Sequence, residues 1–243
     1  MRADEDDGLI EEQIDFYRAD AEAFDEWLVT LIDPSNHEPV ARSYRAGRRR
    51  ATQLFAQRAP LGDVLEIAAG TGRLAELYVQ HVDSGLLLDA SPESLALAAR
   101  RVGSEARISL LEADVFDWQQ DRTFDTIVFT AWLHHVPHSR FSAFWTKVQT
   151  LLAPGGRVIF DFPDAELNPP GKLEIPAEPA DGYGFYAPQD GISIRDHFRR
   201  RWRVVHNLWH RDELSSRLAE LGWHVEFVGP GLFANIVWAE ATR

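Results

Sequence analysis

The sequence predicts an α/β protein with a Rossmann-like doubly wound sheet, mostly parallel, an antiparallel C-terminal hairpin strand and an N-terminal helical segment. Short apolar runs alternate with helical stretches through the middle of the chain, as in a parallel sheet covered on both faces. Apolar side chains recur every three or four residues over 9–32, which indicates an amphipathic helix or a broken pair of helices. Near the C-terminus, Gly229-Pro230-Gly231 separates two strand-like runs by a distance that suits a hairpin.

At the N-terminus, Pro34 and Pro39 are expected to end the first helix. A second helical stretch is predicted from about residue 43 to 57. Residues 1–58 should therefore form a helical unit, and residues 59–243 the sheet with its own helices.

In the core, the apolar runs predict strands joined by right-handed crossovers. The expected strands are 63–68, 85–89, 107–111, 124–130, 157–162, 203–209, 223–228 and 233–240. The expected helices are 72–81, one that opens at Ser91-Pro92, 139–152 and 212–221.

Between residues 163 and 199, prolines and glycines interrupt any regular pattern. A connection this long inside a compact domain is usually functional or disordered. Because it holds Tyr183, Phe185 and Tyr186, it is too aromatic for a plain linker. We therefore expect an insertion that faces the substrate, with Tyr183 and Tyr186 in the binding surface.

Composition excludes several functions. The chain has 243 residues, 45% hydrophobic and 26% charged, as in globular proteins. It has no cysteine, which excludes disulfides, thiolate nucleophiles and Cys-ligated zinc. The net charge of −13 argues against nucleic-acid binding, and the runs Arg48–Arg50 and Arg199–Arg201 are interpreted as solvated faces. With neither a membrane-spanning run nor an apolar signal segment, a cytoplasmic protein is expected; its arginine bias is associated with GC-rich bacterial genomes.

The segment from Glu66 to Gly72 has the pattern of a ligand-binding turn between a strand and a helix. At the carboxyl edge of an open α/β sheet, such turns hold cofactors. Gly70-x-Gly72-x-x-Ala75, with Asp89 further on, fits the dinucleotide fingerprint, so a nicotinamide-dependent oxidoreductase is one alternative.

The charge of Glu66 favours a different cofactor. A carboxylate at the strand end repels a pyrophosphate but attracts the ammonium and sulfonium of S-adenosylmethionine. At about 4 Å near a protein surface, one such charge pair is worth on the order of 4 kcal/mol before desolvation.

On these residues the sequence resembles the class I S-adenosylmethionine-dependent methyltransferases, and the likeness covers nearly the whole chain. Further matching strings are FDTIVFTAW at 124–132 and LLAPGGRVIF at 151–160. The resemblance implies S-adenosylmethionine as cofactor and S-adenosylhomocysteine as product. The residues it implies in the cofactor site are Tyr17, Glu66, Ala68, Gly70, Gly72, Asp89, Ala90, Asp114, Val115, Thr130 and Trp132.

The resemblance also implies that the N-terminal helices, 1–58, form a lid over the cofactor. Tyr17 is expected near the methionine carboxylate, and Phe24 at the substrate or in the core. Where the acceptor needs a base, the candidates are His134, His135 and Asp161. His134 and His135 can equally have a structural role. His197, His206 and His210 are expected to be surface or strand residues, and no metal site is expected.

For the acceptor, the aromatic side chains suggest a small molecule, aromatic or otherwise a specialised metabolite, methylated on oxygen, nitrogen or carbon in natural product biosynthesis. No nucleic-acid or membrane partner is expected, and the chain should be a monomer or homodimer. A binding module that keeps the cofactor fold without turnover is the remaining alternative.

Overall fold

The computed structural model describes residues 3–103, 107–168, 184–185, 191–197, 200–233 and 235–243. Its main sheet has seven strands in the order β3-β2-β1-β4-β5-β10-β9. They are β1 (Asp63–Ile67), β2 (Ser84–Asp89), β3 (Ile108–Glu112), β4 (Phe124–Phe129), β5 (Leu152–Pro163), β9 (His224–Pro230) and β10 (Ile236–Thr242). The first five run parallel, and β10 is antiparallel to both β5 and β9. The predicted sheet with its antiparallel hairpin is confirmed.

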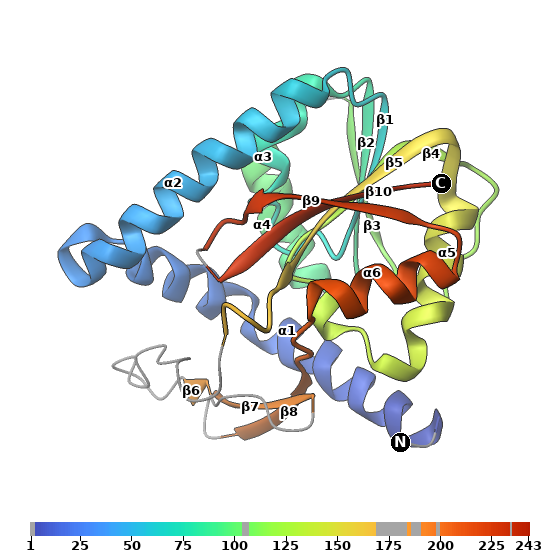
Figure 1. Cartoon of the computed structure of the whole chain (residues 1–243). Coiled ribbons are helices and arrows are strands. Elements are labelled where there is room, and N and C mark those ends of the chain that lie inside the picture. Colours follow the sequence, from blue (N-terminus) through green and yellow to red (C-terminus); the bar gives the residue numbers. More distant parts are fainter. Residues whose placement is uncertain (1–2, 104–106, 169–183, 186–190, 198–199, 234) are drawn as a thin grey trace.

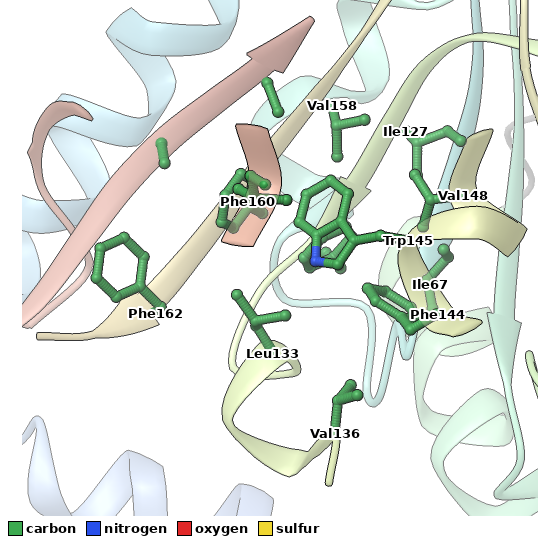
Figure 2. Close-up of a cluster of buried hydrophobic side chains, with 14 of the residues drawn as sticks. Ile67, Ile127, Leu133, Val136, Phe144, Trp145, Val148, Val158, Phe160 and Phe162 are labelled. Atoms are coloured by element: carbon green, nitrogen blue, oxygen red, sulfur yellow. The ribbon is translucent and has the colours of Figure 1, made fainter. Parts of the chain in front are cut away.

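The central strands are apolar on both sides because helices cover both faces of the sheet (Figure 1). On one face, Trp145 is fully buried, with its ring centroid 5.3 Å from that of Phe160. Figure 2 shows Phe144 and Trp145 lying over the strand residues Ile127, Val158 and Phe160. The other face carries a second cluster, to which Phe55 and Trp238 belong.

The helices agree in type with the sequence prediction and differ in their ends. In chain order they are α1 (Ala3–Leu31), α2 (Pro34–Arg58), α3 (Ala75–Tyr78), α4 (Pro92–Val102), α5 (Phe141–Leu151) and α6 (Arg211–Glu220). Short 3₁₀ turns are η1 (Val79–His81), η2 (Leu133–His135) and η3 (His138–Arg140). As predicted, Ser91 caps α4: its hydroxyl accepts a 3.0 Å hydrogen bond from the Ser94 amide.

The prediction for the two prolines was wrong at Pro39, which lies inside α2. Pro34 occupies the start of this helix, where no backbone donor is needed. Asp33 caps it by accepting a 2.8 Å hydrogen bond from the Ser35 amide. Pro39, in the second turn, loses one helical bond, but its fixed φ suits the helix and does not end it.

The described parts of the insertion contain strands that the proline and glycine pattern had hidden. β6 (Gly184–Phe185), β7 (Ile192–His197) and β8 (Arg200–Val205) form a small antiparallel sheet. The strand predicted at 203–209 is β8, which begins at Arg200 and ends at Val205. β8 packs against α1, so the small sheet lies on the other side of α1 from the main sheet (Figure 1). Tyr183 and Tyr186 lie outside the described residues.

No helix within the described ranges is both long enough and apolar enough to cross a lipid bilayer.

Candidate cofactor and acceptor site

The turn after β1 meets the acid at the end of β2. Asp89 accepts hydrogen bonds from the amide of Gly70 at 2.7 Å and from that of Ser91 at 2.8 Å. Burial raises the pKa of Asp89, against the lowering effect of these amide N–H groups. Gly70 has a φ of +54°, and a Cβ added there would meet no atom within 4 Å. The turn thus presents open backbone beside a carboxylate, which is what a bound ligand with hydroxyl groups requires.

The residues predicted at the adenine edge, Asp114 and Val115, follow β3, and those predicted near the methionine moiety, Thr130 and Trp132, follow β4. Asp114 accepts a 2.9 Å hydrogen bond from the Phe116 amide, and burial raises the pKa of its carboxyl group. Val115 is buried. The Trp132 ring packs 6.4 Å from Phe116, while Thr130 directly follows β4 and is partly buried.

Glu66, on β1, is only 2% exposed, and its carboxyl group accepts a hydrogen bond from the Tyr78 hydroxyl. Burial raises the pKa of Glu66 from 4.5 to about 8; the Tyr78 bond opposes this and the nearby Asp89 carboxylate adds to it. Without a cation beside it, the carboxyl group is therefore mostly protonated at neutral pH. Glu66 can therefore carry the negative charge expected from the sequence only if the bound cofactor lowers its pKa.

This coupling predicts that S-adenosylmethionine binding releases a proton near pH 7. Because the pKa of Glu66 is raised in the folded protein, stability without cofactor should fall as pH rises from about 4.5 to about 8. A cation beside the group should lower that pKa again. Calorimetric titrations in two buffers of different ionisation enthalpy should give different heats, and Glu66→Gln should reduce the difference. Equal heats for the wild-type protein would contradict the coupling.

Helix α1 runs along the carboxyl edge of the parallel strands. Arg18 donates to the Ala90 carbonyl at 2.9 and 3.1 Å, just after β2, and lies 3.7 Å from Glu112 of β3. Asp25 accepts a 2.9 Å hydrogen bond from the Thr71 hydroxyl, inside the turn after β1. The helix is therefore placed to cover a ligand bound at these loops.

Asp25 has further polar partners besides Thr71. It also forms ion pairs with Arg73 at 2.8 Å and with Arg101 at 2.7 Å. Burial alone would raise the pKa of Asp25, but the hydrogen bonds from Arg73, Arg101 and Thr71 lower it overall. One charged carboxylate thus joins α1 to the turn after β1 and to α4.

Tyr17 of α1 contacts His135, which belongs to η2 after β4. The Tyr17 hydroxyl lies 2.7 Å from His135 Nε2, and His135 Nδ1 lies 2.6 Å from the Val205 carbonyl. Since a carbonyl only accepts, Nδ1 carries the hydrogen and Nε2 accepts from Tyr17. Burial, His206 and Arg195 hold the pKa of His135 well below its usual range, so the ring is neutral.

His134 and His206 extend this pair into a group of three imidazoles. The His134 ring centroid lies 3.9 Å from that of His135 and 4.7 Å from that of His206. Arg195 of β7 approaches His206 Nδ1 at 3.4 Å. His206, expected to be a surface or strand residue, directly follows β8, is partly buried and packs against His134 of η2.

Asp161, the third predicted acid–base candidate, lies near the end of β5 and is 2% exposed. It accepts a 2.7 Å hydrogen bond from the amide of Ala131, whose φ is +49°. Burial raises the pKa of Asp161 to about 7, against the lowering effect of this amide. The acid therefore holds the loop that leads to His134 and His135.

Sequence reasoning missed the residues that reach the site from distant segments, namely Gln13, Arg18, Asp25, Arg195 and Asn207. Gln13 bridges His135 and Val205, and the Asn207 amide donates to the His134 carbonyl at 2.9 Å. No local spacing signals these contacts. The side chain of Phe24 lies outside the described residues.

Comparisons with known proteins agree with this geometry. A family model described as "Methyltransferase domain" matches residues 64–156. Nodulation protein S of Rhizobium tropici is 27% identical over 104 residues, 42% of this chain and 43% of that protein. The match thus spans less than half the length of this curated relative. The DhpI complex with S-adenosylhomocysteine (SAH) is 30% identical, with 97% of both chains covered and a TM-score of 0.69.

A glycopeptide N-methyltransferase, MtfA, solved with S-adenosylmethionine, shares the fold at 20% identity, 81% of this chain, 93% of that chain and a TM-score of 0.58. The sheet order, the turn after β1 and these likenesses define an S-adenosylmethionine-dependent enzyme of Rossmann-like fold. The chain belongs to the class I S-adenosylmethionine-dependent methyltransferases. Its cofactor is S-adenosylmethionine, and SAH is the product.

Proposed function

We propose that the protein transfers the methyl group of S-adenosylmethionine to a small-molecule acceptor, on oxygen, nitrogen or carbon, in the biosynthesis of a specialised metabolite. The observation that carries this proposal is the convergence of Asp89, the Gly70–Gly72 turn and Asp25 of α1 at one edge of the sheet. Support for the acceptor class comes from MtfA, a glycopeptide N-methyltransferase.

For cofactor binding, Asp89 would accept hydrogen bonds from the ribose hydroxyls, with Ala90, Asp114 and Val115 beside the adenine. The methionine end would lie toward Glu66, Ala68, Gly72 and Thr130. Residues 1–58 would act as the lid. The cofactor supplies a methyl group activated by its sulfonium, so the protein mainly has to align the acceptor with that group.

For proton transfer, the structure supports a Tyr17–His135 pair. Because the Tyr17 hydrogen points to His135, the hydroxyl oxygen can accept a hydrogen bond from a donor on its other side. An acceptor O–H or N–H could pass its proton to Tyr17 while Tyr17 passes its own to His135 Nε2. The low pKa of His135 makes it a weak base, so we assign the pair mainly to orientation.

Replacement of Tyr17 should separate orientation from base catalysis. If the pair orients the acceptor, Tyr17→Phe and His135→Gln should each lower kcat by about 10²-fold or less and leave the pH profile of kcat unchanged. SAH affinity should remain within a few-fold of wild type in His135→Gln. A pH–rate limb that disappears in both variants would instead identify His135 as the base.

The acceptor can be sought directly. Purified protein, incubated with S-adenosylmethionine carrying a deuterated methyl group and with metabolite extracts, should give a product heavier by one labelled methyl. Asp89→Ala protein should give much less of this product at a cofactor concentration that does not saturate the variant. Normal cofactor binding without any methylated product from extracts of several sources would favour a binding module instead.

A further inference from the structure

The small sheet brings a buried arginine against the imidazoles that follow β4. Arg195 is 5% exposed, His134 8% and His135 5%. Arg195 lies 3.4 Å from His206 Nδ1, and its guanidinium stands 6.0 Å from the Phe16 ring centre. We call Arg195, His206 and His134 the Arg195 cluster. It lies directly beside the Tyr17–His135 pair, since the tilted rings of His134 and His135 have their centroids 3.9 Å apart.

The hydrogen-bond directions in this cluster favour an acceptor of hydrogen bonds as ligand. A guanidinium only donates, so His206 Nδ1 accepts from Arg195 and the ring hydrogen of neutral His206 is on Nε2. The Nδ1 atom of His134 is buried and has no hydrogen-bond partner among the described residues. The cluster thus combines a fixed positive charge, the Nε2–H donor of His206 and a buried ring nitrogen of His134 without a partner among the described residues.

Charge is distributed very unevenly along the chain. The whole protein carries −13, yet residues 192–210 contain Arg195, Arg199, Arg200, Arg201 and Arg203 against the single acid Asp196. The described part of this segment contains β7 and β8, and β8 packs against α1. Arg203 forms a 2.7 Å ion pair with Glu12 of α1, so the excess positive charge of this segment rests on its other arginines, of which Arg195 is buried beside the imidazoles. An excess of positive charge within an acidic protein attracts anions to that place.

We infer that the Arg195 cluster is the subsite for an oxyanion on the acceptor, a carboxylate or a phosphate-type group, held beside Tyr17 and His135. This inference rests on the proposed function and adds to it the charge class of the substrate. Burial and the charge of Arg195 lower the pKa of His206 to about 3, and burial, the neighbouring imidazoles and Arg195 lower that of His134. A bound anion would reverse the effect of Arg195 on both rings.

The test uses the full chain saturated with SAH and follows the imidazole signals by NMR. Inorganic phosphate and acetate are added separately at constant ionic strength, with chloride as reference. We expect saturable binding of at least one oxyanion, with the pKa of His206 raised by about 1–3 pH units. Stronger binding of phosphate than of acetate would assign a phosphate-type group, and the reverse a carboxylate.

Two variants complete the experiment. Arg195→Gln should weaken oxyanion binding by roughly tenfold or more, because a charge-assisted bond is lost. Arg200→Ala is the matched control, since Arg200 lies on the same small sheet but is exposed above Trp202, and it should bind the oxyanion as the wild type does. No saturable binding to the wild type, or equal binding in Arg195→Gln, would overturn the inference. If the wild-type protein does not bind SAH, that result counts against the proposed function and not against the oxyanion subsite.

Discussion

Asp89→Ala is expected to weaken SAH binding by about 1–3 kcal/mol, which is the cost of leaving polar ligand groups without a partner. The side chain is bonded to the amides of Gly70 and Ser91 at 2.7 and 2.8 Å, so its loss also releases the turn after β1 from the end of β2. Asp89→Asn, which can still accept one of these bonds, should lie between the alanine variant and wild type. Equilibrium titration with SAH measures all three.

Asp63 offers a matched control for that experiment. It begins β1 at the opposite edge of the sheet and pairs there with Arg122 at 3.3 Å. Asp63→Ala should therefore leave SAH affinity unchanged. If Asp89→Ala bound SAH as tightly as wild type, Asp89 would not be the ribose-binding acid.

Asp25→Ala is expected to release α1 from the turn after β1 and to destabilise the protein. Removing one partner of a fully buried ion pair costs about 3–5 kcal/mol, and we expect roughly 2–3 here because the side chains of Asp25 and Arg73 retain 17% and 20% exposure. The free energy of unfolding should fall by that amount. SAH affinity should fall as well, because Asp25 holds α1 to Thr71 in the cofactor turn.

The pH dependence of stability gives a second measure of the contacts that Asp25 makes. The pKa of Asp25 is lowered from 3.8, so its contribution to stability should be present above about pH 4 and be lost as pH falls below it. Glu38 is the control, since it also pairs with two arginines, Arg42 and Arg45, but on the exposed face of α2. Glu38→Ala should change the free energy of unfolding little. If Glu38→Ala and Asp25→Ala had equal effects, Asp25 would not be the residue that holds α1 to the turn after β1.

The main sheet could be predicted because each of its strands has a local pattern in the sequence. Runs such as Val64–Ile67 are buried on both faces, and Gly229-Pro230-Gly231 marks the hairpin between β9 and β10. The acid at the end of β2 was predictable for the same reason, since the carboxyl ends of parallel strands share one edge. Local pattern and tertiary position agree at these residues.

The contacts made by α1 and by the small sheet could not be predicted in the same way. Asp25 resembles any solvated acid on a helix, and its partners Arg73 and Arg101 follow 48 and 76 residues later. Arg195 lies on β7, in the segment whose prolines and glycines interrupt any regular pattern, and His206 directly follows β8. Only the pairing of β7 with β8 brings these two side chains together. Contacts between distant segments leave no periodic signal in one sequence.

Titration of the wild-type protein with SAH, and separately with NADH, tests the central claim most directly. A cofactor site built from Asp89, the Gly70–Gly72 turn and the α1 lid predicts saturable SAH binding in the micromolar range and no measurable binding of NADH. A flat SAH trace from folded protein, or tighter binding of the dinucleotide, would contradict it.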